Sequence, residues 1–387
     1  MPTKFTGLIL ASGVTSGDPI ERVLAALAPF SLTVLSSEIL YIRDRFIYTV
    51  LVEMSPDHVE VLSEDLDAIA QEGSAGGKSQ IDIAYDFGAF SLPIPGSEQE
   101  EVRVVALAHT LTPSQLLAIH QKIAPAGQIS AFLTSLIDGF TVARYTVRIE
   151  SQKISGLRES LKELSATSRI SLSLIQSASE IVGAETLLFD MDSTFINEEV
   201  IDELAKIAGV GEQVAAITER AMAGELDFSQ SLRERVGLLK GQPATIFDRV
   251  RSTLTLTQGA EDLVHQAHAR GAKVGIVSGG FHDVIDSFLE PLKLDLVVAN
   301  RFEIVDGVLT GNVLGEIVDR DVKSRTLQEF SKTSTRSIAI GDGANDQGML
   351  EAADIGIAFC AKPALNEVAD LQIRHRDLRA VLHLIGY

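Results

Sequence analysis

The sequence contains no tryptophan and a single cysteine, Cys360, among its 387 residues. One cysteine excludes an intramolecular disulfide framework and a cysteine-based metal cluster. The apolar runs are all shorter than the roughly 18 residues that a membrane-spanning helix needs. The amino terminus also lacks the charged and apolar segments of a signal peptide. We therefore expect a cytoplasmic protein that does not associate with a membrane, with Cys360 serving as a buried structural residue.

Positive charge is scarce as well, with 33 Lys and Arg residues against 53 Asp and Glu and a net charge of −20. A protein this acidic repels nucleic acids and anionic lipids, so we expect no partner of either kind. If the ligand is an anion, its binding site must supply positive charge locally. Hydrophobic residues make up 45% of the chain, which is ordinary for a globular protein, and the length suggests two or three domains.

The first 180 residues repeat one pattern of predicted elements, namely strand, helix, strand, strand, helix and strand. The copies span residues 1–92 and 93–180, and the segment from Pro93 to Glu101 has the composition of a linker. Asp18 precedes the first helix of the first copy, and Asp138-Gly139 predicts a tight hairpin turn in the second. Neither copy has acidic residues, histidines or cysteines at catalytic spacing, so we expect two small α+β domains that serve assembly or ligand sensing.

From residue 181 to residue 387 strands alternate with helices, which indicates an α/β domain with a parallel sheet. Between the first and second predicted strands, about residues 197–257 are helical in pattern. This insertion is too long for a simple crossover and predicts a lid over the site. The predicted strands are Thr186–Phe189, Lys273–Val277, Leu294–Val298, Ser337–Ile340 and Ile355–Ala358.

Two carboxylates, Asp190 and Asp192, directly follow the apolar run Leu187–Phe189. Active sites of open parallel sheets form at the carboxyl ends of strands, and side chains two residues apart on a strand point the same way. Two acids this close raise each other's pKa unless a cation or a shared proton relieves the repulsion. The pattern therefore predicts a Mg²⁺ site that is completed by a phosphate group.

Other strand ends carry residues that suit the same ligand. Ser278-Gly279-Gly280 offers a hydroxyl and backbone N–H groups at what reads as the start of a helix, although a plain glycine-rich turn has the same pattern. Lys323 offers a point charge, although a lone lysine is usually surface. The segment Gly341–Asp346 contains Asp342, Asn345 and Asp346, which are good metal or phosphate ligands on a tight loop.

The motifs D-x-D-x-T, Ser-Gly-Gly, Lys and G-D-G-x-N-D, in this order, resemble those of the haloacid dehalogenase superfamily of phosphohydrolases. Within it, Asn197–Glu199, Phe228–Arg235 and Phe359–Pro363 resemble segments of phosphoserine phosphatases. The resemblance implies a Rossmann-like parallel sheet with a helical cap. It also implies Mg²⁺-dependent hydrolysis of O-phospho-L-serine to L-serine and phosphate through an aspartyl phosphate, the last step of serine biosynthesis.

The resemblance also implies a role for each site residue. Asp190 resembles the nucleophile and Asp192 the general acid and base. Mg²⁺ would be bound by Asp190, Asp342 and the backbone carbonyl of Asp192, supported by Asp346. The phosphoryl group would be held by Ser278, Gly279, Lys323 and Asn345, with Gly280 in support. In the cap, Glu199 would bind the substrate ammonium and Arg235 its carboxylate, while Met222 and Phe228 would exclude water. Arg233, near Arg235, is expected to be a surface residue.

The two amino-terminal copies resemble ACT domains, which bind amino acids and dimerise. The resemblance implies a homodimer that forms through these domains. In ACT domains the ligand-binding loop usually has a glycine directly after its proline. In the loops Gly17–Ile20 and Leu111–Ser114 that position is Ile20 and Ser114, which weakens the case for an amino-acid effector. Two alternatives to a phosphoserine phosphatase stay open. One is a phosphatase of this superfamily for another small phosphometabolite, and the other is an amino-acid-sensing regulator with a vestigial hydrolase domain.

Overall fold

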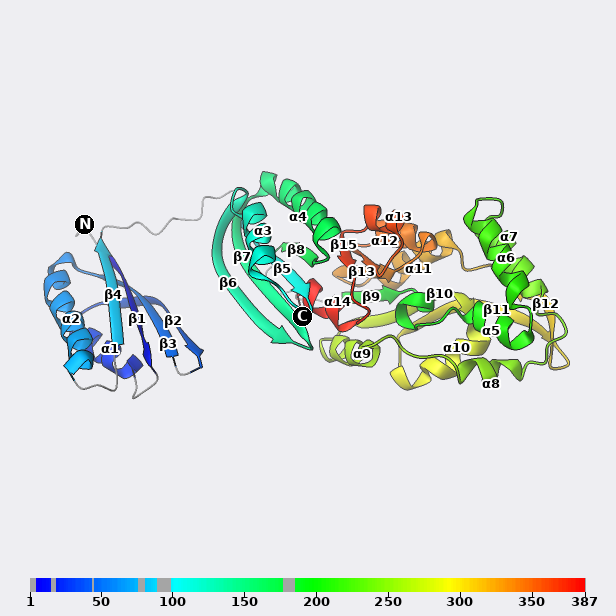
Figure 1. Ribbon diagram of the computed structural model, residues 1–387, viewed down its shortest axis with the longest axis horizontal. Helices are drawn as coiled ribbons and strands as arrows, with labels where there is room; N and C mark the ends of the chain where they lie inside the picture. The colour runs from blue at the N-terminus through cyan, green and yellow to red at the C-terminus, as the bar shows by residue number, and fades with distance from the viewer. Residues whose placement is uncertain are drawn as a thin grey trace. The chain divides into compact units, whose positions relative to one another are not determined.

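The computed structural model describes residues 5–14, 19–43, 45–75, 81–88, 99–176 and 185–386. The chain forms two compact units, residues 1–97 and 98–387 (Figure 1). Asp18, Gly17 and most of the predicted linker, residues 93–98, lie outside the described residues. In the part of the chain that is described, no helix has the length and apolar character needed to cross a membrane.

The first unit is a four-stranded antiparallel sheet with strand order β2-β3-β1-β4. Val23 and Leu27 of α1 and Leu62 and Leu66 of α2 are buried in one core with the sheet residue Val50. This is the βαββαβ order predicted from the sequence. The elements are β1 (Phe5–Val14), α1 (Pro19–Leu27), β2 (Thr33–Ile42), β3 (Arg45–Met54), α2 (Val59–Ala75) and β4 (Ile81–Gly88).

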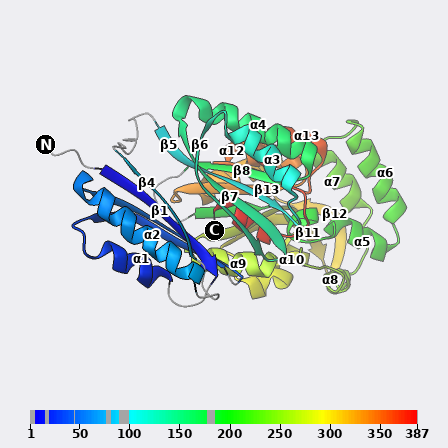
Figure 2. The ribbon, with the colours of Figure 1, turned by 60° about the vertical axis from the view of Figure 1, so that its left-hand side comes forward.

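The second unit begins with another βαββαβ module, whose strand order is β6-β7-β5-β8. Helix α3 starts with a capping box in which Thr112 and Gln115 each satisfy the other's backbone N–H. Asp138 and Gly139 both have positive φ, as the predicted hairpin turn requires. Helices α3 and α4 lie side by side over the sheet in Figures 1 and 2. The elements are β5 (Gln99–Ala108), α3 (Pro113–Ile123), β6 (Gly127–Ile137), β7 (Phe140–Glu150), α4 (Ile154–Ser168) and β8 (Ser171–Gln176).

The rest of the second unit is built on a seven-stranded sheet with order β12-β11-β10-β9-β13-β14-β15. The fully buried strand β9 pairs in parallel with β10 on one side and with β13 on the other, so three carboxyl ends meet at one edge. Strand β12 is antiparallel to β11 and was not among the predicted strands, nor was β15. The strands are β9 (Glu185–Phe189), β10 (Lys273–Phe281), β11 (Leu296–Val305), β12 (Val308–Leu314), β13 (Arg336–Gly341), β14 (Ile355–Phe359) and β15 (Leu371–Ile373).

Helices cover both faces of this sheet and form the cap. The inserted segment folds as four helices, α5 (Val200–Ala208), α6 (Gly211–Met222), α7 (Phe228–Gly237) and α8 (Ile246–Arg251), as predicted for the cap. Its two connections to the sheet are joined where Ile196 bridges Leu256. The remaining helices are α9 (Ala260–Ala269), α10 (His282–Leu289), α11 (Arg320–Phe330), α12 (Gln347–Ala352), α13 (Pro363–Val368) and α14 (Arg379–Ile385).

The second βαββαβ module shares its core with the seven-stranded domain. Val105, Leu107, Phe140 and Val142 belong to the same buried cluster as residues of β9 and α14. Helix α14 packs against β5 and β8, and β15 lies against β8. The predicted boundary between residues 180 and 181 therefore falls inside one compact unit, and its use as a domain boundary stays a prediction.

Candidate active site

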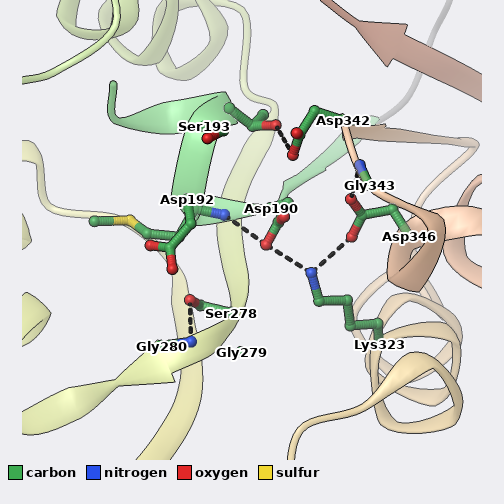
Figure 3. A network of polar contacts seen from close by, with 12 residues as sticks. Asp190, Asp192, Ser193, Ser278, Gly279, Gly280, Lys323, Asp342, Gly343 and Asp346 are labelled. Carbon is green, nitrogen blue, oxygen red and sulfur yellow. Dashed lines mark hydrogen bonds and ion pairs between the residues drawn. The ribbon is translucent and has the colours of Figure 1, made fainter. Parts of the chain in front are cut away.

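The nucleophile candidate Asp190 stands at the end of the central strand β9. Its backbone N–H donates to the carbonyl of Ile340 on β13 at 2.8 Å, and its Oδ1 accepts from the N–H of Met191 at 2.8 Å. The chain then turns, because Asp192 is extended and Ser193 has a φ of 56°. This turn brings the carboxylates of Asp190 and Asp192 toward the same space at the sheet edge (Figure 3).

Lys323 is fully buried and connects two of the acids. Its Nζ donates to Oδ1 of Asp190 and to Oδ1 of Asp346, each at 2.6 Å (Figure 3). Burial lowers the pKa of Lys323, but the two carboxylates raise it above its usual value overall, so the ammonium stays charged. Lys323 is therefore not the surface residue that a lone lysine usually is. Asp319 caps α11 by accepting from the N–H groups of Asp321 and Val322, which fixes the turn that carries Lys323.

Three carboxylates converge beside this lysine. Oxygen atoms of Asp190, Asp342 and Asp346 lie within 4.8 Å of one another. Asp342 accepts from the hydroxyl of Thr194 at 3.3 Å, and Asp346 accepts from the N–H of Gly343 at 3.0 Å. Burial and the nearby charge of Asp346 raise the pKa of Asp342 to about 6, and the same two causes raise the pKa of Asp190 well above its usual value. Three acids around one ammonium leave an excess of negative charge that fits a divalent cation.

Asp192 differs from Asp190 because it does not form a hydrogen bond with Lys323. Its Oδ2 accepts from the N–H of Val200 at 3.3 Å, whereas its buried Oδ1 has no hydrogen-bond partner among the residues that the structure describes. Burial, then the charge of Glu199, raises the pKa of Asp192 well above its usual value. A protonated Asp192 has a donor to offer to a ligand in the cavity.

Ser278, Gly279 and Gly280 lie opposite these acids. The sequence predicts them at the start of a helix, but they belong to strand β10. Strand β10 continues to Phe281, with a register shift in its pairing to β11 between Val277 and Phe281, and α10 begins only at His282. The N–H of Gly280 donates to the Ser278 hydroxyl at 2.8 Å. The buried Asn300, which sequence reasoning missed, donates to the carbonyl of Gly279 at 2.8 Å and so fixes this peptide.

The cap closes one side of a cavity of about 950 Å³ at this edge of the sheet. Cap residues in the lining include Glu199, Phe228 and Arg235. A Cβ on Gly279 would lie 2.9 Å from Cζ of Phe228, so this ring closely covers the glycine. Of the predicted site residues at the sheet edge, five line the cavity, namely Asp190, Asp192, Gly279, Asp342 and Asn345. Ser278, Gly280, Lys323 and Asp346 are not among the lining residues.

The two charged cap residues are held by local hydrogen bonds. Glu199 accepts from the Ser193 hydroxyl at 2.8 Å, and Nε of Arg235 donates to the carbonyl of Ser231 at 3.3 Å. Burial lowers the pKa of Arg235, while Asp202 and Glu199 act in the opposite direction. Arg233 is exposed and does not line the cavity, as expected for a surface residue.

Two further cavity residues were missed, and one prediction was wrong. Arg320 and Lys362 add positive charge to the lining. Cys360 is exposed rather than buried, because β14 ends at Phe359 and the chain turns at Cys360 with a φ of 47°. Neighbouring protein atoms still displace part of the water around its thiol, and this desolvation raises the thiol's pKa. The side chain of Met222 lies outside the described part of the chain, so its expected contact with the cavity stays a prediction.

The region of the chain that carries this site matches known protein families. The family profile described as haloacid dehalogenase-like hydrolase matches residues 187–351, and a second profile with the same description matches residues 322–385. The phosphoserine phosphatase of Streptococcus thermophilus is 49% identical over 211 residues, which cover 54% of this chain and 97% of that protein.

Similarity extends beyond the hydrolase region. Phosphoserine phosphatase SerB2 of Mycobacterium tuberculosis is 35% identical over 391 residues, covering 100% of this chain and 94% of the relative. The crystal structure of a had family hydrolase from Salmonella enterica superposes with a TM-score of 0.65 at 31% identity, covering 73% of this chain and 99% of that one. The chain therefore belongs to the phosphoserine phosphatase family of haloacid dehalogenase-like hydrolases.

Proposed function

We propose that this enzyme hydrolyses O-phospho-L-serine to L-serine and phosphate through a phosphorylated Asp190. The observation that carries the proposal is the contact of Asp190 with the buried ammonium of Lys323, which leaves a carboxylate oriented toward the cavity. Full-length similarity to phosphoserine phosphatases supports the substrate. The complete set of acids, lysine and serine argues against a vestigial hydrolase domain.

We propose Mg²⁺ as the cofactor. Asp190, Asp342 and the backbone carbonyl of Asp192 would hold it, and Asp346 would serve mainly to fix Lys323, since it already accepts from that lysine and from Gly343. The fit rests on the convergence of carboxylate oxygens of Asp190, Asp342 and Asp346 within 4.8 Å of one another. A bound cation would also relieve the raised pKa values of Asp190 and Asp342. When bound, Mg²⁺ neutralises the charge of the phosphoryl oxygens.

In the first step, a carboxylate oxygen of Asp190 attacks phosphorus and forms an acyl phosphate while the bond from phosphorus to the serine oxygen breaks. Asp192 donates its proton to that serine oxygen, and the upward shift of its pKa favours the protonated form that this step needs. In the second step, Asp192 takes a proton from water, the water oxygen attacks phosphorus, and the bond to Asp190 breaks. Splitting the displacement in two lets one acid–base residue serve both halves.

Lys323, the Ser278 hydroxyl, the N–H of Gly279 and Asn345 would hold the phosphoryl oxygens during both steps. Fixed donors of this kind contribute most of phosphoryl-transfer catalysis, since they need no reorganisation as charge develops. The bond from Asn300 to the Gly279 carbonyl keeps that peptide oriented.

The cap would recognise the serine part of the substrate. Arg235 presents a planar pair of donors that suits a carboxylate, and Glu199 presents an acceptor for an ammonium. Phe228, packed over Gly279, would exclude water from the reacting atoms, and Met222 would assist. A phosphate ester without the amino acid part would lose the contacts to Glu199 and Arg235, which favours phosphoserine over other small phosphometabolites.

The wider setting is also part of the proposal. The enzyme would act in the cytoplasm at the last step of serine biosynthesis. It would form a homodimer through the amino-terminal βαββαβ modules, which keep edge strands available for pairing.

An activity screen tests the function directly. The purified enzyme is assayed with phosphoserine, phosphothreonine and p-nitrophenyl phosphate, each with Mg²⁺ and with a chelator, beside an Asp190→Asn control. We expect Mg²⁺-dependent turnover with the highest kcat/KM on phosphoserine. Equal kcat/KM on all three esters would favour a broader phosphatase, and the absence of turnover with Mg²⁺ would refute an enzymatic role.

A further inference from the structure

The segment from Arg374 to Arg379 runs from the end of β15 to the first residue of α14. It touches the catalytic loop, the cap connections and the second βαββαβ module. We propose that Arg376 is a positioning residue for the reaction, and that the second module sets its place. The role in catalysis rests on the proposed function, whereas the contacts that define it do not.

Arg376 binds the loop that carries the general acid. Its Nη2 donates to the carbonyl of Ser193 at 3.1 Å, and its Nε donates to Oδ1 of Asn197 at 2.9 Å. Ser193 directly follows Asp192 and has a left-handed φ of 56°, a conformation that costs energy for a residue other than glycine. The bond from Arg376 offsets that cost. It therefore helps to hold Asp192, and also Glu199, which accepts from the Ser193 hydroxyl.

The same guanidinium reaches the hinge of the cap. Asn197 stands in the outgoing connection, and its N–H and side-chain amide both donate to Thr255 in the returning connection. Glu198 accepts from the N–H and the hydroxyl of Thr255. Close by, the N–H of Leu378 donates to the carbonyl of Gln258 at 2.8 Å. The segment thus contacts both connections, and Arg376 fixes the point where the cap leaves the sheet.

The second module holds this segment from the other side. The ring of His375 lies 4.5 Å from that of His109 and 5.7 Å from that of Phe140, measured between centroids. Arg374 donates to the carbonyl of Ala166 at 3.4 Å. At the far end of the segment, Asp138 pairs with Arg379 at 3.7 Å, and it also contacts His383 at 3.1 Å.

The residues that neighbour Arg376 in sequence are therefore anchored on the module, whereas Arg376 itself is anchored on the catalytic loop. A change in how the module packs on β15 and α14 would shift His375 and, with it, Arg376. The chemistry would then respond through the orientation of Asp192 and the freedom of the cap, without any contact between the module and the substrate.

The test combines kinetics with hydrogen–deuterium exchange on the full chain. The variants are Arg376→Ala, Arg376→Lys and His109→Ala, the Arg376→Ala/His109→Ala double variant, and Arg325→Ala as the matched control. Arg325 is an exposed arginine that pairs with Glu316. Arg376 is exposed, so its hydrogen bonds are weaker than buried charged bonds, and they act on the chemistry only through the backbone. We therefore expect kcat of Arg376→Ala to fall by about three- to tenfold.

KM and the thermal midpoint should change little in Arg376→Ala, and Arg376→Lys should recover part of kcat through a bond to Ser193. Peptides that cover residues 192–199 and 254–258 should exchange faster in Arg376→Ala and in His109→Ala, but not in Arg325→Ala. In the Arg376→Ala background, His109→Ala should change kcat and the exchange of these peptides little further. Unchanged exchange in Arg376→Ala would overturn the positioning role of Arg376. Fully additive effects of Arg376→Ala and His109→Ala would overturn the inference that the second module sets the place of Arg376. If the wild type hydrolyses no phosphate ester, the proposed function fails while the exchange measurements still decide the contacts.

Discussion

At the scale of single residues, Asp190 and Asp192 lie on one turn, but their surroundings give the two carboxylates different properties. Asp190 contacts a buried ammonium, whereas Asp192 contacts a backbone N–H and lies near Glu199. The first arrangement favours a carboxylate that attacks, and the second favours a carboxyl group that gives up a proton. The order of the motif points to both residues, and their different folded environments match the different roles that we propose for them.

Replacing Asp190 by asparagine tests the nucleophile. We expect kcat for phosphoserine to fall by about three orders of magnitude or more, because an amide oxygen does not form the acyl phosphate. The fold should persist, since asparagine can still accept from Lys323 and Met191. Mass spectrometry of wild-type enzyme quenched during turnover should locate the phosphate on Asp190. Phosphate trapped on a different residue would contradict the assignment.

Replacing Arg235 by alanine tests recognition of the substrate carboxylate. A charged hydrogen bond is worth about 1.5–3 kcal/mol, so KM for phosphoserine should rise by about ten- to a hundredfold. KM for p-nitrophenyl phosphate, which has no carboxylate, should change little. Arg233→Ala removes an exposed arginine of the same helix and serves as the control. Equal losses of kcat/KM on both esters would mean that Arg235 supports the cap or the phosphoryl group instead.

At the scale of elements, the sequence predicts strands well where apolar runs are bounded by turn residues and less well elsewhere. The order of both βαββαβ modules and the helical cap were predicted, since their periodicity is local. Strand β12 was missed although Asp306-Gly307 has the same turn signal as Asp138-Gly139, because Gly311 and Asn312 interrupt its apolar pattern. Asn300 and Arg376 have no sequence signal, because their roles depend on partners 18 or more residues away.

The contact between the second module and the hydrolase domain should weaken in acid. Burial lowers the pKa of both His375 and His383 below their usual value. A histidine with a depressed pKa in the folded state binds protons more readily once unfolded. Its contribution to stability is therefore present above about pH 6.5 and is lost as the pH falls through the folded-state pKa. Asp342, whose pKa is raised to about 6, acts with the opposite sign.

The histidine contribution is isolated by comparison with a variant. The wild type and His375→Gln are compared by the difference between their thermal midpoints. We expect this difference to shrink as the pH falls from neutral toward acid. The carboxylates of the active site are common to both proteins and cancel in the difference. A difference that grows in acid would reverse the sign and contradict the prediction.

At the scale of the whole molecule, the amino-terminal modules have apolar residues on strands that lie at the edge of a sheet. Strands β2 and β6 are outermost in their sheets, and each exposes large apolar side chains. On β2 these are Val34, Leu35, Ile39, Leu40 and Tyr41, and on β6 they are Phe132, Leu133 and Leu136. Proteins usually cover or pair such edges, and closed twofold dimers are the commonest soluble oligomers.

The expected outcome is a homodimer, measured by light scattering at micromolar concentration. Leu136 is 76% exposed on β6, so Leu133→Lys/Leu136→Lys should leave the fold of the module intact. If β6 pairs with a second copy, the two charges should shift the protein to a monomer, because desolvating unpaired lysines opposes association. Leu117→Lys, at a 55% exposed position on α3 of the same module, is the control and should leave the dimer unchanged. A wild-type monomer would rule out the dimer, whereas a β6 variant that remains dimeric would move the interface to another surface, with β2 tested next.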